Sequence, residues 1–90
     1  GNQNLTVVRI LSMKVSIKIP KVGLTVEDVV FTEWAKECGS ILDLGEIIAV
    51  VESDKTTFEI PAPTDGTLVE TLCQAGQTVA VGEIIGVIER

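Results

Sequence analysis

The amino-acid sequence predicts an all-β domain in which two similar halves close on one core, as a small sandwich or flattened barrel. Polar and apolar residues alternate along several short segments, which is typical of half-buried strands. No segment shows sustained helical periodicity with capping residues at both ends. A stretch of the chain also recurs once, without a gap, 37 residues further on.

The composition limits the chain to one domain with an aliphatic core. Ninety residues support a single modest core. Hydrophobic residues make up 46% of the chain but aromatic residues only 3%, so Val, Ile, Leu and Ala must build the core. This apolar content excludes a disordered chain, which could not offset its ordering entropy.

The first strand follows a segment of different character. Residues 1–12 are predicted to be a leader, native or introduced during cloning, and residues 13–90 the domain; an extra native edge strand at 1–12 stays open as the alternative. Residues 14–20 alternate in polarity as a strand does, and Pro20 ends them because proline cannot donate to a ladder. Residues 21–28 are predicted to be a loop, and 29–34 resume an extended pattern.

The repeat defines the two halves. Residues 39–52 match residues 76–89, and each copy holds a glycine-led turn, a short strand, a Gly-Glu turn and a longer apolar strand. Two copies are too few for a solenoid. A pseudo-twofold axis through one shared core fits better. Glu46 and Glu83, at equivalent turn positions, are predicted to serve turn chemistry rather than acid–base catalysis.

After the first copy the chain turns back on itself. Residues 50–60 read as two strands joined by a two-residue turn, Asp54 and Lys55. A one-residue slip in the pairing would bury Glu59, so side-chain alternation fixes the register. The predicted pairs are Ser53 with Thr56, Glu52 with Thr57, Val51 with Phe58, and Ala49 with Ile60.

Lys55 at this turn is the principal candidate site. It is the only basic residue between Glu37 and Glu89. Two-residue hairpin turns favour Asn-Gly or Asp-Gly, so local backbone preference does not explain a lysine here. A single amine at the tip of a rigid, acidic hairpin is a good target for an enzyme that attaches a group to it.

Charge and residue usage exclude several function classes. All thirteen acidic residues lie between Glu27 and Glu89, where Lys36 and Lys55 are the only bases. This argues against nucleic-acid and anionic-membrane partners, which need clustered Lys and Arg. The absence of histidine removes the commonest general base and metal ligand, so a self-contained enzyme or a metal site is not expected.

The two cysteines point to a reducing compartment. Cys38 and Cys73 lack CxxC or metal-ligand spacing, and we predict small buried or half-buried residues rather than a disulfide. Disulfides are rare in reducing compartments, which makes such a compartment the default expectation.

Several motifs resemble those of a known family. Residues 45–56 read GEIIAVVESDKT and are followed by IPAP at 60–63, Asp65-Gly66 and the closing copy at 76–89. Together they resemble the lipoyl domains of 2-oxo acid dehydrogenase acyltransferase components, and residues 19–28, running into Trp34, are also similar. The resemblance covers residues 14–89.

The resemblance implies a flattened barrel-sandwich hybrid of two four-stranded antiparallel sheets with internal pseudo-twofold symmetry. The acceptor lysine would lie at one end and both termini at the other. Lys55 would carry lipoic acid through an amide, and Asp54 and Thr56 would present the lysine. The loop at 21–28 would lie near Lys55 and help a decarboxylase choose its partner.

The resemblance also implies partners and a place in the cell. A lipoate ligase or a lipoyl/octanoyl transferase would attach the cofactor. A thiamine-diphosphate-dependent 2-oxo acid decarboxylase, an acyltransferase core and a dihydrolipoyl dehydrogenase would use it in turn, with this chain as a non-catalytic carrier. The location implied is the cytoplasm, or the mitochondrial matrix in a eukaryote.

Other readings stay open at this point. A biotin carrier has the same fold and a turn lysine, but it typically flanks that lysine with methionines, and Met13 is the only methionine here. The lipoylated carrier of glycine cleavage is longer. An unmodified interaction module, like the lipoyl-like domains of efflux adaptors, is the third alternative.

Overall fold

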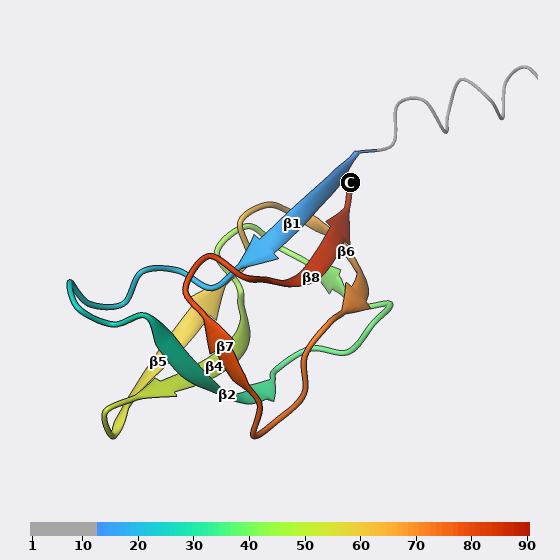
Figure 1. The fold of residues 1–90 in the computed structure, drawn as a ribbon. Coiled ribbons are helices and arrows are strands. Elements are labelled where there is room, and N and C mark those ends of the chain that lie inside the picture. Colours follow the sequence, from blue (N-terminus) through green and yellow to red (C-terminus); the bar gives the residue numbers. More distant parts are fainter. Residues whose placement is uncertain (1–12) are drawn as a thin grey trace, which may run out of the picture.

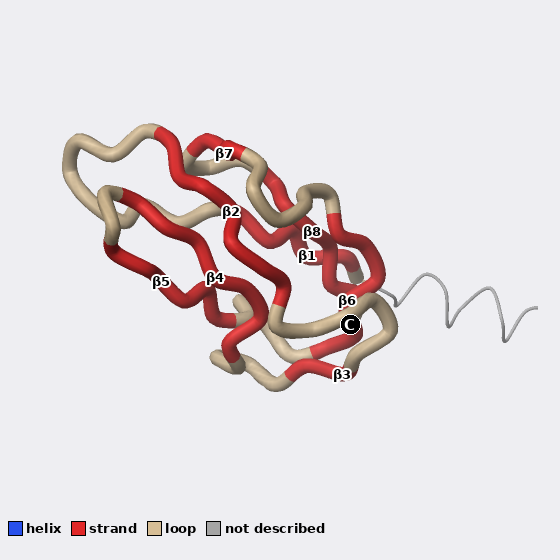
Figure 2. Tube along the Cα trace, turned by 90° about the horizontal axis from the view of Figure 1, so that it is seen from below, coloured by secondary structure: helices blue, strands red, loops and turns tan. Residues whose placement is uncertain are grey.

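The computed structural model describes residues 13–90 as eight strands in two four-stranded antiparallel sheets (Figures 1 and 2). The predicted leader, residues 1–12, lies outside the described residues. The strands are β1 (Lys14–Lys18), β2 (Asp28–Trp34), β3 (Ile41–Leu42), β4 (Ile47–Ser53), β5 (Thr56–Pro61), β6 (Gly66–Thr71), β7 (Thr78–Ala80) and β8 (Ile84–Glu89). The predicted all-β fold of two four-stranded sheets is confirmed.

The strand order contains the predicted twofold relation. One sheet has the order β1-β8-β6-β3 and the other β5-β4-β2-β7. Exchanging β1 with β5, β2 with β6, β3 with β7 and β4 with β8 converts the first order into the second. Each sheet therefore takes two strands from each half of the chain, and the halves interlock rather than stack as separate units.

Hydrogen bonds between the halves occur in equivalent pairs. The Gly39 N–H donates to the Leu68 carbonyl at 2.7 Å, and the Gly76 N–H donates to the Phe31 carbonyl at 2.8 Å. Gly76 lies 37 positions after Gly39, and Leu68 lies 37 positions after Phe31. The same contact thus links each half to the other, as a pseudo-twofold axis requires.

The Gly-Glu turns of the repeat are also equivalent. The Glu46 side chain accepts a hydrogen bond from the Asp43 N–H at 3.0 Å, and Glu83 accepts one from the Ala80 N–H at 3.1 Å. The glycine before each glutamate has a positive φ, 85° and 88°, which favours a residue without a Cβ. The predicted turn role of Glu46 and Glu83 is confirmed.

The core between the sheets is aliphatic with one phenylalanine. Among residues 13–90, no polar or charged side chain is buried. The core residues with no measurable exposure are Phe31, Ile48, Ala49, Val51, Leu68, Ile85 and Ile88. Trp34 packs at the margin, where its ring lies 5.0 Å from Phe31 and its N–H donates to the Cys73 carbonyl at 3.0 Å.

Gly86 allows the close packing of β6 and β8. A Cβ at this position would lie 2.8 Å from the Glu70 carbonyl oxygen and 3.1 Å from the Trp34 ring. The equivalent residue in the first half is Ala49, which pairs with Ile60 as Gly86 pairs with Ile17. The second half therefore lacks room for even a methyl group.

The cysteine prediction is right for one residue and wrong for the other. Cys73 is buried, with 5% of its surface exposed, and both cysteines are free thiols. Cys38 is exposed, because it lies in the connection between β2 and β3 rather than on an inward strand position. Within residues 13–90, no helix has the length and hydrophobicity to cross a membrane.

Candidate modification site

The β4–β5 hairpin has the predicted register. Ser53 pairs with Thr56, Val51 with Phe58 and Ala49 with Ile60, which leaves Asp54 and Lys55 as the turn. Val51 and Ile60 are buried at 0% and 2% exposure, so the inward face of each strand is anchored in the core. The turn residues are consequently held at a fixed position beyond the end of the sheet.

The turn backbone is left-handed at both central residues. Asp54 has a φ of 49° and Lys55 a φ of 66°. Positive φ at both positions matches the twist of the flanking strands and is typical of a type I′ turn. Asp tolerates this region better than lysine, for which a left-handed conformation costs about 1–2 kcal/mol. The lysine is thus kept at a position that local backbone energetics disfavour.

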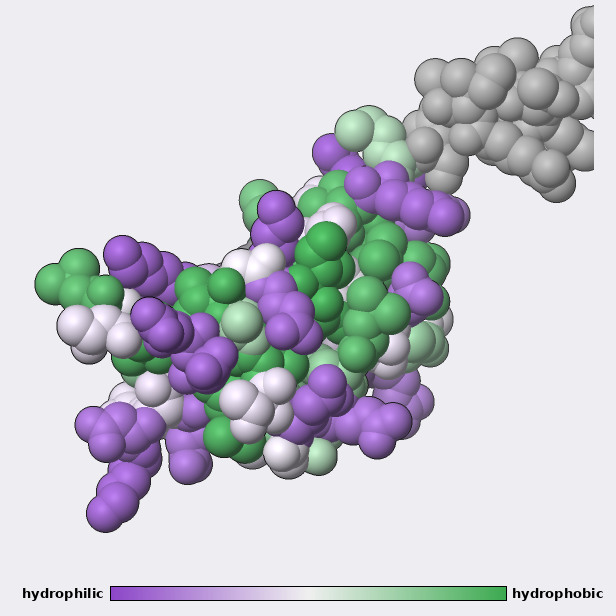
Figure 3. Space-filling model, viewed as in Figure 1, coloured by the Kyte–Doolittle hydropathy of each residue, from purple (hydrophilic) through white to green (hydrophobic). Residues whose placement is uncertain are grey.

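The Lys55 side chain is free to react. Asp54, Lys55 and Thr56 are all exposed. The ion pairs found within residues 13–90 join Lys36 to Glu46 and Arg90 to Asp65, so neither involves Lys55. Figure 3 shows hydrophilic residues projecting at the lower left, where Figure 1 places the tip of the β4–β5 hairpin.

The connection between β1 and β2 lies at the same end as the hairpin. Ile17 pairs with Gly86 as Ile60 pairs with Ala49, so β1 and β5 are equivalent at an offset of 43 residues, whereas the rest of the repeat has an offset of 37. The β1–β2 connection is therefore six residues longer than its counterpart. Both ribbon views place it beside the hairpin end and away from the C-terminus (Figures 1 and 2).

The ends of the described chain lie opposite the hairpin. The Arg90 N–H donates to the Met13 carbonyl at 2.8 Å, so residue 13 is next to the C-terminal residue. In Figure 1 this point is at the upper right and the hairpin tip at the lower left. The arrangement predicted from the resemblance, with the lysine at one end and the chain ends at the other, holds for residues 13–90.

The chemistry that this arrangement offers is acylation of an exposed amine by an external catalyst. Inside the fold, burial, and then the negative charge of Glu83, raise the pKa of the Cys73 thiol to about 11, which keeps this thiol protonated near neutral pH. An amine at a rigid tip, without a paired acid, is accessible to an activated carboxylic acid held by another protein. The exposed Lys55 amine therefore fits a cofactor that is linked through an amide.

The hairpin, its register and the candidate Lys55 could be predicted from the sequence, but two features of the site could not. The first is the positive φ of Lys55. The one indication of it in the sequence is the two-residue length of the hairpin loop, because such loops favour type I′ or II′ turns. The six-residue extension was hidden because β1 and β5 share little beyond Ile17 and Ile60, so their equivalence follows from the register alone.

Comparison with known proteins identifies the family. The profile of a family described as biotin-requiring enzymes matches residues 15–88. The dihydrolipoyllysine-residue succinyltransferase component of the Bacillus subtilis 2-oxoglutarate dehydrogenase complex is 38% identical over 72 residues, which cover 80% of this chain and 17% of that protein. The chain thus spans less than a fifth of this relative.

Solved structures agree with the sequence match. The lipoyl domain of the Azotobacter vinelandii 2-oxoglutarate dehydrogenase complex has a TM-score of 0.65 and 32% identity, covering 80% of this chain and 91% of that domain. Urea carboxylase from Kluyveromyces lactis has a TM-score of 0.73 but only 18% identity over 84% of this chain and 6% of the carboxylase, which shows the fold alone. The chain belongs to the biotin/lipoyl attachment family and, within it, to the lipoyl domains.

Proposed function

We propose that this chain is a lipoyl carrier that bears lipoic acid on Lys55 through an amide. The observation that supports it most directly is the exposed Lys55 amine at the reversal of a hairpin anchored in the core. When bound, the lipoyl group supplies a disulfide that accepts an acyl group and two electrons. The chain contributes position: it holds the attachment point beyond the sheets, where a separate enzyme can reach it.

The flanking residues present the lysine. Asp54 and Thr56 are exposed on either side of Lys55, and Asp54 shares the left-handed backbone conformation of Lys55. A lipoate ligase or a lipoyl/octanoyl transferase recognises this folded hairpin and joins the cofactor to the amine. Attachment removes the charge of Lys55 and makes the domain more acidic.

The partners follow from the carrier role. A thiamine-diphosphate-dependent 2-oxo acid decarboxylase loads the carrier, an acyltransferase core unloads it, and a dihydrolipoyl dehydrogenase restores the disulfide. Tethering raises the local concentration of the acyl group at each active site and prevents its loss by diffusion. The domain itself is non-catalytic and is part of, or partner to, a larger acyltransferase component.

The β1–β2 connection contributes to the choice of decarboxylase. This connection, which is six residues longer than its counterpart, lies beside the hairpin, and its Leu24 is 92% exposed. Leu24→Ser is expected to lower kcat/KM for loading by the decarboxylase about fivefold, the effect of losing roughly 1 kcal/mol at an interface, while leaving attachment of lipoate to Lys55 unchanged. Equal loading of both proteins in a single-turnover acylation assay would remove Leu24 from the recognition surface.

The proposed location is the cytoplasm, or the mitochondrial matrix in a eukaryote. The exposed thiol of Cys38 and the buried thiol of Cys73 are both free, which is compatible with a reducing compartment. Fractionation of cells that produce the full-length protein tests this directly.

Intact mass spectrometry tests the carrier function. The chain is co-expressed with a lipoate-attaching enzyme and, separately, with a biotin-attaching enzyme. We expect one lipoyl increment on the wild type and none on Lys55→Arg, which keeps the charge and the fold. A biotinyl increment without a lipoyl one would support the carboxylase alternative, and an unchanged mass in both cultures would support an unmodified interaction module.

A further inference from the structure

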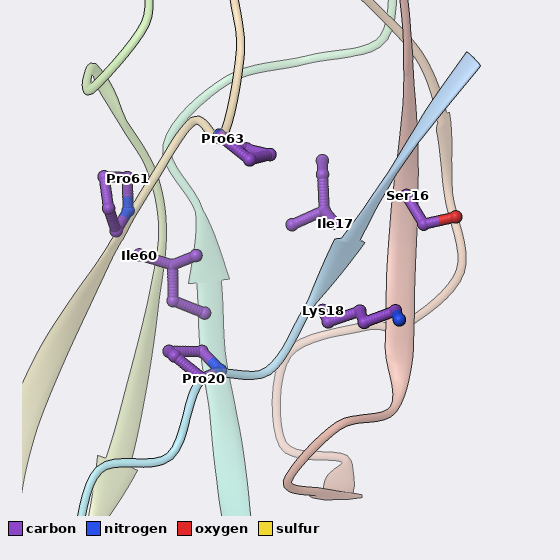
Figure 4. A pocket seen from close by; sticks show the side chains of 7 residues that line it. All are labelled: Ser16, Ile17, Lys18, Pro20, Ile60, Pro61 and Pro63. Atoms are coloured by element: carbon purple, nitrogen blue, oxygen red, sulfur yellow. The ribbon is translucent and has the colours of Figure 1, made fainter.

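A pocket opens between β1 and β5, the edge strands of the two sheets (Figure 4). Its volume is about 360 Å³, within the range of small-ligand pockets. Apart from Ser16, its lining consists of pairs that are equivalent at the offset of 43 residues: Ile17 with Ile60, Lys18 with Pro61, and Pro20 with Pro63. The pocket therefore lies across the pseudo-twofold axis of the domain.

The pocket is chemically apolar. Ile17 and Ile60, exposed at only 1% and 2%, form its base, and the proline rings offer carbon surface without an N–H donor. Its two polar side chains both come from β1, and Figure 4 shows the Ser16 oxygen and the Lys18 nitrogen pointing away from Ile60 and Pro20. This lining suits an aliphatic chain or a carbon–sulfur ring better than a charged group.

The two ends of the pocket differ in their distance from Lys55. Figure 4 shows Pro20 at the end toward which β4 points, which is the direction of the hairpin tip, and Pro63 at the opposite end. Ile60, five residues after Lys55 on β5, is about 17 Å from it at the rise of an antiparallel strand. Pro20 is nearer the tip than Ile60, and Pro63 is farther away.

The reach of a lipoylated lysine matches the nearer end. Eleven bonds separate the lysine Cα from the dithiolane ring, and bonds of about 1.5 Å in a zigzag advance about 1.25 Å each, so the ring extends about 14 Å from the backbone. That length is shorter than the roughly 17 Å to Ile60, so only the end of the pocket nearer the hairpin tip, where Pro20 lies, can come within reach of the ring.

We propose that the Pro20 end of this pocket is a resting site for the dithiolane ring and aliphatic chain carried on Lys55 of the same domain. This rests on the proposed lipoyl attachment. Contact is weak and reversible, because docking must order a long flexible chain. Its consequence is that the carrier shields its reactive sulfurs between visits to active sites instead of leaving them continuously in solvent.

Amide NMR spectra of three forms of the 90-residue chain test the proposal: unmodified, lipoylated and acetylated at Lys55. Acetylation removes the same charge but is too short to reach the pocket. We expect the Ile17, Lys18 and Ile60 amide signals to shift in the lipoylated form alone, with Thr64 and Asp65 beyond the far end unchanged. Identical shifts in both acylated forms, confined to residues 53–57, would overturn the resting site.

A symmetric pair of variants gives the matched control. Pro20 and Pro63 are both exposed and are equivalent across the axis, so Pro20→Glu and Pro63→Glu alter the surface similarly. Pro20→Glu is expected to abolish the lipoyl-dependent shifts at Ile17 and Ile60, and Pro63→Glu to retain them. If the lipoyl-dependent shifts disappear in both variants, or in neither, the ring does not dock at the Pro20 end.

Measuring the intact mass of each sample before the NMR experiment distinguishes failure of this proposal from failure of the carrier function. A chain that accepts no lipoyl group would overturn both. A fully lipoylated chain whose pocket signals match those of the acetylated form would overturn the resting site and leave the carrier function intact.

Discussion

Lys55 occupies a backbone position that suits glycine better. Its φ of 66° places a lysine in the left-handed region, where the Cβ crowds the following carbonyl. Lys55→Gly creates the Asp-Gly pair typical of type I′ turns. We expect it to raise the free energy of unfolding by about 1 kcal/mol, seen as a higher urea midpoint with an unchanged slope.

Thr56→Gly is the control for this substitution. Thr56 begins β5 and does not have a positive φ. Glycine there should lower stability by roughly 0.5–1 kcal/mol, because it adds backbone entropy to the unfolded chain without relieving strain. If both glycine variants are destabilised equally, the left-handed geometry of Lys55 has no energetic cost, and functional selection is not needed to explain the lysine.

Glu46 makes the stability of the domain depend on pH. The hydrogen bond from Lys36, and then the one from the Asp43 N–H, hold the pKa of Glu46 below its ordinary value of 4.5. The ionised form is therefore favoured in the folded state. The contribution of ionised Glu46 to the free energy of unfolding is fully present above pH 4.5. It is lost as the pH falls through the lower pKa that Glu46 has in the folded state.

Glu46→Gln tests this dependence. The variant should unfold at a lower urea concentration than the wild type at pH 7 and low salt, and the two midpoints should converge as the pH falls below 4.5. The effect is modest because the pair is exposed to solvent and screened. The same substitution in a Lys36→Met background should show a smaller difference at pH 7. A constant difference at all pH values would rule out the charge as its cause.

At the scale of single elements, Gly86 is a point of close approach between β6 and β8. Gly86→Ala would place a methyl group 2.8 Å from the Glu70 carbonyl and against the Trp34 ring. We expect a loss of about 1–3 kcal/mol, typical of overpacking, and a change in tryptophan fluorescence, measured by urea unfolding. Unchanged stability would mean that β8 shifts freely to make room.

The elements also show what the sequence could and could not predict. The β4–β5 register followed from local alternation, because only one pairing keeps Glu59 in solvent while burying Val51 and Ile60. The six-residue extension after Pro20 could not be recognised, because the outward residues of β1 and β5 differ and carry no repeat signal. The exposure of Cys38 depends on a loop whose path is set by distant strands.

At the scale of the whole molecule, the interlocking of the two halves fixes the site. Each sheet contains strands from both copies of the repeat, and hairpin β4–β5 connects the halves at the end of the domain opposite residues 13 and 90. The sequence indicated the symmetry, and the resemblance implied the two four-stranded sheets. Which strands share a sheet is a non-local property that periodicity alone does not determine.

This architecture separates the attachment point from the chain ends. Met13 and Arg90 lie together at the end opposite the hairpin, so a longer protein could continue from either without obstructing Lys55. The β1–β2 connection beside the hairpin then faces whatever enzyme approaches the tip. The carrier role is consequently a property of the whole fold.

Exchanging the two turn residues tests the central claim most directly. Asp54→Lys combined with Lys55→Asp keeps the composition, the net charge and a lysine in the turn, but it moves the amine by one residue. After co-expression with a lipoate-attaching enzyme, we predict one lipoyl increment on the wild type and none on the folded exchange variant by intact mass. Equal modification of both proteins would contradict the claim that the hairpin presents the amine of Lys55 specifically.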